Sequence, residues 1–186
     1  SKAARDSAGI LDASTLGKID IQGTDASEFL NRVYTNAWSK LEIGKCRYGL
    51  MLNEDGMVYD DGVTTRLDEN HYIMTTTTGG AATVLGKLED YLQTEWPELD
   101  VYLTSVTDHY ATISVCGPNS KKIIQKVIPE IDLSDKDFPH MSFKNSKIGK
   151  VKCRVMRISF TGEQSYEINI QANYAKSVWE NCMEAG

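Results

Sequence analysis

Two adjacent acidic residues in the segment MVYDDGV are the strongest candidates for chemistry in this sequence. Side chains alternate between the two faces of a strand, so Asp61 is predicted to share a face with Tyr59 and Val63, with Asp60 on the other. Burying a carboxylate among apolar groups costs free energy, so such a carboxylate is expected to be hydrogen-bonded or to have a role in function. Beside an amine it can accept a proton or stabilise a developing cation. The alternative is a surface hairpin with two solvated aspartates, which the spacing alone favours.

The segment TGEQSYEI supplies a second pair of carboxylates, Glu163 and Glu167. A carboxylate matches the two parallel N–H donors of an amidine-like edge, such as those of pterin, guanine and arginine. Ordinary surface glutamates are the alternative. Tyr48 and Phe160 lie in strand-like segments near these carboxylates and could stack on a flat ligand, although aromatic residues more often pack in a core.

The remaining composition excludes several function classes. A formal net charge of -6 without a long basic block disfavours nucleic acid and anionic membranes as partners. The three histidines share no metal-ligand spacing, so no metal site is expected. Neither GxSxG nor GxGxxG occurs, which removes the usual signatures of serine hydrolases and of self-contained flavin or nicotinamide domains.

The cysteines and the hydropathy pattern bear on the cellular compartment. Four cysteines are scattered singly and are expected to be buried reduced thiols: Cys46, Cys116, Cys153 and Cys182. No signal peptide and no apolar run of about 18 residues occurs. We therefore expect a soluble, cytoplasmic protein.

Short strands and helices must position the candidate residues. The turn formers at 53–56 predict a hairpin of two strands, 46–52 and 57–65. A second strand pair is predicted at 152–160 and 166–170. Further strands are expected at 72–77, 101–106 and 110–116, and helices at 25–38, from 81 to about 94, from 117 through 124, and at 174–183. The order lacks strict βαβ alternation, which predicts an α+β fold with mixed, mainly antiparallel sheets and packed helices.

Four ordered motifs together resemble the aminomethyltransferase family, which includes the T-protein of the glycine cleavage system. They are GILDAS, YGLMLNEDGMVYDDGV, ISVCGP and RISFTGEQSYEI, and they span essentially the whole chain. The words YTNAW, TTTTGGAA and EDYLQTEWP are similar to the alpha subunits of heterotetrameric sarcosine oxidases. The resemblance implies the folate-binding T-protein fold, with one lobe of residues 1–47 plus 109–186 and a second, inserted lobe of residues 48–108. The family's C-terminal barrel and a later arginine would lie beyond Gly186.

The resemblance also implies a function. The domain would capture, on tetrahydrofolate, the one-carbon unit released when sarcosine is oxidised, giving 5,10-methylenetetrahydrofolate beside glycine and hydrogen peroxide. FAD or FMN and NAD would bind elsewhere in the complex, and the beta, gamma and delta subunits would be partners. One alternative is a free-standing aminomethyltransferase of the glycine cleavage system. Another is a non-catalytic folate-binding accessory protein.

Site residues follow from the matching motifs. The second Asp of the DD pair matches Asp61, implied as the catalytic carboxylate that faces the N10 region of the folate, and Asp60 is then the structural member. Tyr48 is implied to line the folate pocket and Glu167 to bind the pterin ring. Glu163 is a weaker candidate.

Three departures from the family pattern affect the expected folate contacts. Thr65 stands where T-proteins have a tyrosine, and Thr77 stands about where they have an asparagine. Phe160 occupies a place where a tyrosine hydroxyl is common. Thr77 and Phe160 are still expected to contact the folate.

Overall fold

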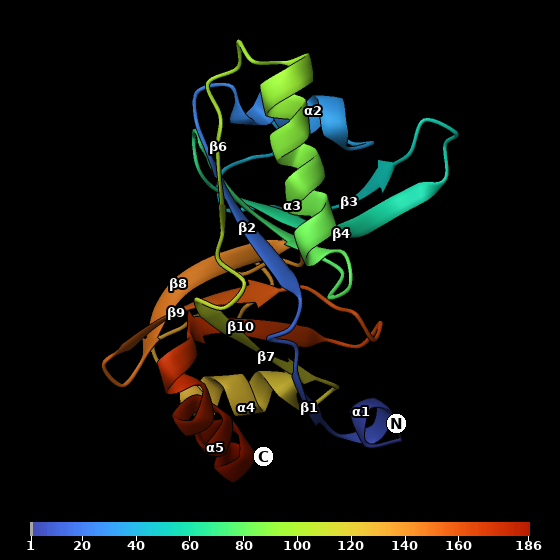
Figure 1. Cartoon of the computed structure of the whole chain (residues 1–186). Helices are drawn as coiled ribbons and strands as arrows, with labels where there is room; N and C mark the ends of the chain where they lie inside the picture. The colour runs from blue at the N-terminus through green and yellow to red at the C-terminus, as the bar shows by residue number, and fades with distance from the viewer. Residues whose placement is uncertain (1) are drawn as a thin grey trace. The chain divides into compact units, whose positions relative to one another are not determined.

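The computed structural model describes residues 2–186 and divides them into two compact units, each built on a five-stranded sheet (Figure 1). The first unit combines the chain up to Thr15 with Asp108–Gly186, and the second is the continuous segment Leu16–Thr107. All strand pairs within the two sheets are antiparallel. The predicted α+β class with antiparallel sheets is confirmed.

The boundary between the units differs from the expected lobes. Residues 16–47, expected in the first lobe, lie in the second unit. The physical reason is strand pairing, because the strand at Gly17–Gln22 lies between two strands of the second unit's sheet. The later boundary, after Thr107, lies one residue from the expected position.

The sheet of the second unit has the order β3-β4-β5-β2-β6. Its strands are β2 (Gly17–Gln22), β3 (Cys46–Leu52), β4 (Val58–Asp68), β5 (His71–Thr76) and β6 (Tyr102–Ser105). The helices are α2 (Ala26–Val33), the short 3-10 helix η1 (Trp38–Lys40), α3 (Ala81–Asp90) and the π-helical turn η2 (Tyr91–Glu95). The predicted helix over 25–38 is shorter because the chain becomes extended at Tyr34, which bridges to Met51 of β3.

The sheet of the first unit has the order β1-β7-β10-β9-β8. Its strands are β1 (Gly9–Asp12), β7 (Tyr110–Cys116), β8 (Ser142–Ile148), β9 (Val151–Arg157) and β10 (Ser165–Gln171). The helices are α1 (Lys2–Asp6), α4 (Ser120–Val127), η3 (Ala172–Tyr174) and α5 (Ala175–Ala185). Helices α4 and α5 pack on one face of the sheet and close its apolar core. All four cysteines of the chain are buried and free, as expected.

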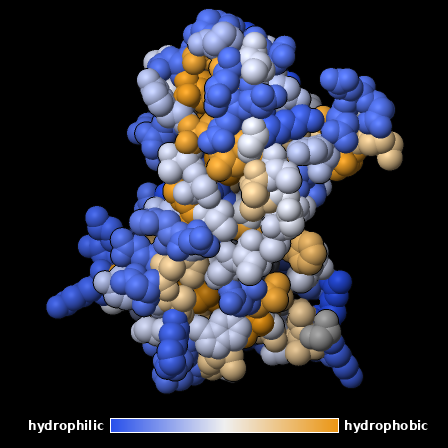
Figure 2. Space-filling model, in the orientation of Figure 1, coloured by the Kyte–Doolittle hydropathy of each residue, from blue (hydrophilic) through white to orange (hydrophobic). Residues whose placement is uncertain are grey.

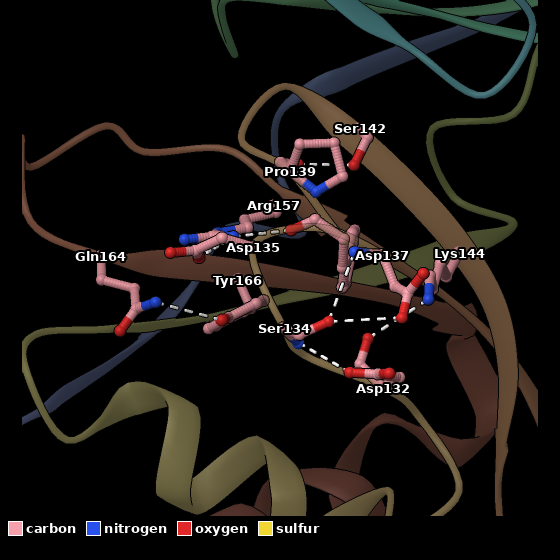
Figure 3. Close-up of polar contacts among 11 residues, drawn as sticks. Asp132, Ser134, Asp135, Asp137, Pro139, Ser142, Lys144, Arg157, Gln164 and Tyr166 are labelled. Atoms are coloured by element: carbon pink, nitrogen blue, oxygen red, sulfur yellow. Dashed lines mark hydrogen bonds and ion pairs between the residues drawn. The ribbon is translucent and has the colours of Figure 1, made fainter.

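The loop between α4 and β8 is fastened to the sheet by polar contacts (Figure 3). The main-chain N–H of Ser134 donates to Asp132 over 2.8 Å, and the Lys144 ammonium donates to the Asp132 carbonyl over 3.2 Å. Arg157 of β9 forms an ion pair of 2.7 Å with Asp135 of the loop. The Ser134 N–H is the main reason that the pKa of Asp132 is lowered to about 2. Two cations of the β8–β9 hairpin are thus engaged with this loop.

Candidate functional site

The hairpin of β3 and β4 brings Tyr48 and Asp61 together. Tyr48 pairs with Val63 and Leu50 with Asp61, so the two functional side chains are diagonal neighbours on one face of the sheet. The Tyr48 hydroxyl donates a hydrogen bond of 2.7 Å to Oδ2 of Asp61. This bond is the main reason that the pKa of Tyr48 is raised. The raised pKa means that the Tyr48 phenol keeps its proton. Tyr48 is 49% exposed, so its ring is accessible beside the Asp61 carboxylate.

A β-bulge changes the face of Tyr59 relative to Asp61, so the predicted sharing of a face by these two residues is wrong. Asp60 and Val58 have partners on β3, but Tyr59 between them has none and is the extra residue of β4. The Tyr59 hydroxyl donates to a main-chain carbonyl of α3 over 3.4 Å. Tyr59 therefore lies on the α3 side, with Asp60, while Asp61 lies on the Tyr48 side.

Asp60 is the buried member of the acidic pair, with 4% of its surface exposed. Thr77 donates to it twice, through the hydroxyl over 2.6 Å and through the main-chain N–H over 3.2 Å. The N–H of Gly80, which precedes α3, donates to the Thr77 hydroxyl over 3.1 Å. Burial raises the pKa of Asp60, and the bonds from Thr77 partly offset that rise. Asp60 thus ties β4 to the start of α3, while Thr77 has its hydroxyl engaged with Asp60.

Two glycines of the hairpin leave no room for a side chain. A Cβ atom on Gly49 would lie 2.6 Å from Trp38 and 3.1 Å from Tyr34, whose rings cover that position. A Cβ atom on Gly62 would lie 1.9 Å from the carbonyl oxygen of Thr75 on β5. The glycines in the words YGLM and DDGV are therefore required by close packing around Tyr48 and Asp61.

Tyr34 is a neighbour of the acidic pair that the sequence patterns do not single out. It is buried, and its hydroxyl has no hydrogen-bond partner among residues 2–186. Burial is the main cause of its raised pKa, followed by the charges of Asp60 and Asp61. Helical periodicity marks Tyr34 only as a core residue, so its position near two carboxylates could not be read from the sequence.

Glu167 lies on β10, the central strand of the first unit's sheet, with 8% of its surface exposed. Its chain neighbours Tyr166 and Ile168 belong to the apolar core under α4 and α5, so Glu167 points to the opposite face. On that face Asn169 follows it along β10 and accepts a 2.6 Å hydrogen bond from the Thr112 hydroxyl. Glu167 is thus a buried carboxylate on a polar sheet face.

The segment 158–164 carries the two other residues expected from the sequence. Strand β9 ends at Arg157, before the predicted end, so Phe160 lies in a loop with 90% of its surface exposed. Glu163 pairs with Arg5 of the N-terminal segment over 2.6 Å. This pairing gives Glu163 a structural partner within the first unit, and Phe160 leaves its ring accessible.

The site residues therefore form separate groups. The second unit joins Tyr48 with Asp61 and Asp60 with Thr77, and the first unit carries Glu167. No cluster of three His, Cys, Asp or Glu side chains within residues 2–186 could hold a metal ion. No helix in this described part of the chain has the length and apolar character needed to cross a membrane.

Comparison with known proteins gives close relatives over the whole chain. The chain is 54% identical over 186 residues to sarcosine oxidase subunit alpha of Corynebacterium sp. (strain U-96), covering 100% of this chain and 19% of that protein. It is 50% identical over 184 residues to the same subunit of Rhizobium meliloti (strain 1021), covering 98% of this chain and 18% of the relative. The aminomethyltransferase of Caldanaerobacter subterraneus subsp. tengcongensis is 33% identical over 185 residues, 100% of this chain and 48% of the relative. The chain spans about a fifth of the first two relatives and about half of the third.

Solved structures share the fold. The glycine cleavage system aminomethyltransferase T from Bartonella henselae superposes with a TM-score of 0.82 at 22% identity, covering 98% of this chain and 47% of that one. A chain of heterotetrameric sarcosine oxidase from Corynebacterium sp. U-96 gives a TM-score of 0.68 at 14% identity, covering 98% of this chain and 87% of that one. The family described as the GCVT N-terminal domain matches residues 1–186. With this match over its whole length, the chain belongs to the GCVT N-terminal domain family.

Proposed function

We propose that this chain is the folate-binding part of a sarcosine oxidase. In this role it takes up, on tetrahydrofolate, the one-carbon unit of sarcosine and yields 5,10-methylenetetrahydrofolate, while the complex releases glycine and hydrogen peroxide. Identities of 50–54% with sarcosine oxidase alpha subunits support this assignment. The structural observation that carries it is the 2.7 Å hydrogen bond from Tyr48 to Asp61, which fixes a carboxylate beside an accessible aromatic ring. The beta, gamma and delta subunits of such an oxidase are the proposed partners, and its flavins and NAD bind outside this chain.

The residues present fit a reduced folate. The pterin ring offers an amidine-like edge, and Glu167 supplies a carboxylate on a polar sheet face that can pair with it bidentately. Tyr48 supplies an accessible ring for stacking against a flat group. Phe160, with its exposed ring, and Thr77 are the further proposed contacts.

The proposed chemistry centres on proton transfer to Asp61. Tetrahydrofolate supplies the nucleophilic nitrogens N5 and N10 that accept the one-carbon unit. Asp61 accepts the proton that N10 loses, and Tyr48 positions Asp61 by donating to one carboxylate oxygen, so that the other oxygen can receive the proton. Because hydrogen bonding to Asp61 raises the pKa of Tyr48, the phenol keeps its proton and remains a donor.

The experiment that tests this function measures folinic acid binding and methylenetetrahydrofolate formation in the intact protein complex. Asp61→Asn keeps an oxygen that can accept the Tyr48 hydrogen bond but removes the base. We expect near-normal folinic acid affinity and a loss of product formation of about 100-fold or more. Glu167→Ala should weaken folinic acid binding by about tenfold or more, because a charge-assisted contact is lost.

Glu54→Gln is the matched control, since it removes one charge from the exposed turn of the same hairpin. It should leave both measurements unchanged. Unchanged product formation in Asp61→Asn would remove the catalytic role of Asp61, and full folinic acid affinity in Glu167→Ala would remove its binding role.

A second candidate function is that of an aminomethyltransferase of the glycine cleavage system. Relatives with the name aminomethyltransferase are 29–33% identical over the whole chain, which is lower than the identity to the oxidase subunits. The two candidate functions differ in their one-carbon donor, so assays with different donors distinguish them. Product formation from an aminomethylated lipoyl carrier, without sarcosine, would favour the transferase.

A further inference from the structure

The base of the β3–β4 hairpin holds an aromatic ring beside two glycines that pair with each other. Hydrophilic side chains gather at the projecting end of this hairpin (Figure 2). At its base Gly49 of β3 pairs with Gly62 of β4, so neither strand presents a side chain in this row. The ring of Tyr34 lies against Gly49, since a Cβ atom there would come within 3.1 Å of Cδ1 of Tyr34. The paired glycines therefore allow a phenol ring to lie across β3.

Strand pairing directs Tyr34 toward Asp60. Tyr34 bridges to Met51 of β3, and Met51 pairs with Asp60 of β4, so the three residues form one row across the strands. Residues paired in such a row share one face of a sheet. At about 4.8 Å between strands, the Cα atoms of Tyr34 and Asp60 lie roughly 10 Å apart, and a tyrosine side chain spans most of that distance. The row and the ring together bring the Tyr34 hydroxyl close to the Asp60 carboxylate.

Both side chains are buried and keep unused hydrogen-bonding capacity. Tyr34 is 5% exposed, and its hydroxyl has no hydrogen-bond partner among residues 2–186. Each carboxylate oxygen of Asp60 accepts one hydrogen bond from Thr77, whereas an ionised carboxylate offers about four acceptor positions. Leaving a buried hydroxyl unpaired costs free energy, while a buried water with two or more polar partners is a stable part of a protein interior. A donor and an acceptor for such a water are therefore present together.

Asp60 holds β4 at the position where Asp61 follows. Thr77 reaches Asp60 from the β5 side of the sheet, and a Cβ atom on Gly80 would lie 2.4 Å from Oδ1 of Asp60. Tyr34 approaches from the β3 side. Asp61 is the next residue along β4, with its side chain on the opposite face, so a movement of the main chain at Asp60 also moves Asp61.

We propose that one buried water joins the Tyr34 hydroxyl to the Asp60 carboxylate, and that Tyr34 is thereby a positioning residue for Asp61. The positioning role rests on the proposed folate function, whereas the link to Asp60 does not. The Tyr34 hydroxyl donates to the water, and the water donates to a carboxylate oxygen of Asp60. This link stabilises the ionised form of Asp60 and holds β4 from its β3 side, beside the bulge at Tyr59.

Urea unfolding of the wild type and Tyr34→Phe, from pH 8 down to about pH 3, tests the link. Phenylalanine keeps the ring beside Gly49 and removes only the hydroxyl. At pH 7 the midpoint should fall by about 0.5 M or more, because the ionised carboxylate loses a hydrogen-bond donor. The deficit should shrink as the pH falls through the raised pKa of Asp60, since the link favours the ionised carboxylate.

A second background identifies the carboxylate that is responsible. In Asp60→Asn, adding Tyr34→Phe should lower the midpoint by a smaller amount that does not change with pH. This background separates Asp60 from Asp61, the charged neighbour that acts on it, and from Lys87 of α3, which lies over the Tyr59 ring. A raised midpoint in Tyr34→Phe, or a deficit that is independent of pH in the wild-type background, would overturn the link.

Product formation in the intact protein complex tests the positioning role. Tyr34→Phe should lower 5,10-methylenetetrahydrofolate formation by about fivefold and leave folinic acid affinity unchanged. Tyr174→Phe is the matched control, because it removes a hydroxyl from an exposed tyrosine of the first unit, and it should change neither the midpoint nor product formation. Unchanged product formation in Tyr34→Phe would overturn the positioning role and leave the proposed function standing. No product from the wild-type complex with saturating tetrahydrofolate and sarcosine would overturn the proposed function, and the positioning role with it.

Discussion

Gly62, directly after Asp61, offers a sharp test of how closely β4 and β5 approach. A Cβ atom at this position would lie 1.9 Å from the Thr75 carbonyl oxygen, whereas Cβ contacts under 3.0 Å essentially never occur. In Gly62→Ala the two strands must therefore separate by about 1 Å. That movement strains the two 3.0 Å contacts between the Thr75 hydroxyl and the main chain of Val63. Overpacking costs about 1–3 kcal/mol and each weakened hydrogen bond about 1 kcal/mol, so the free energy of unfolding should fall by about 3 kcal/mol.

Urea unfolding followed by tryptophan fluorescence measures this loss, because Trp38 and Trp96 report on the second unit. With an m-value of about 1–3 kcal/mol/M, the midpoint should fall by about 1–3 M. Gly86→Ala is the control: a Cβ atom there meets nothing within 4 Å, and alanine favours the helix interior. It should stabilise the protein by up to about 1 kcal/mol. A Gly62→Ala midpoint within about 0.3 M of the wild type would refute the close approach of the strands.

Two further predictions concern titrating side chains. Asp60→Ala should lower the free energy of unfolding by about 1–3 kcal/mol because Thr77 loses its acceptor, whereas Asp60→Asn, which keeps an acceptor without a buried charge, should be nearly neutral at pH 7. Equal losses of unfolding free energy in Asp60→Ala and Asp60→Asn at pH 7 would contradict this role of the hydrogen-bond acceptor. Since burial raises the pKa of Asp60, the wild type should gain stability relative to Asp60→Asn as the pH falls through that raised pKa toward 3.8. Asp132→Asn should be less stable than the wild type above pH 3.8, and the deficit should shrink as the pH falls through about 2, because the lowered pKa of Asp132 gives stability only while the group is ionised. Urea midpoints measured across this pH range check it, and a deficit independent of pH would rule it out.

Local patterns were enough to predict the elements whose signals lie in adjacent residues. The hairpin of β3 and β4 follows from turn formers between two apolar strands, and the observed bounds differ from the prediction by at most a few residues. Strand β8 was missed because its sequence, SFKNSKI, is polar and rich in lysine. It lies at the edge of the sheet, where charged side chains are common and prevent pairing with other chains. The short strand β1 was missed as well, since its pairing partner, β7, lies far away in the sequence.

The site was predictable in composition but not in orientation. The pairing of Tyr48 with Asp61 agrees with their expected proximity. The burial of Asp60 depends on Thr77 and on the start of α3, and the bulge at Tyr59 depends on the register with β3. Neither the burial of Asp60 nor the bulge at Tyr59 can be predicted from the spacing of residues in the segment MVYDDGV.

The insertion of one unit into the other has a consequence for the order of folding. Residues 16–107 form an uninterrupted segment with its own core, whereas the first unit must pair β1 with β7, bringing Gly9 and Cys116 together across more than a hundred residues. Closing so long a loop costs more chain entropy than forming the hairpins within the segment. Synthesis from the N-terminus delivers the complete second unit first. Strand β1 is therefore synthesised before β7 and lacks this partner strand until β7 has been made.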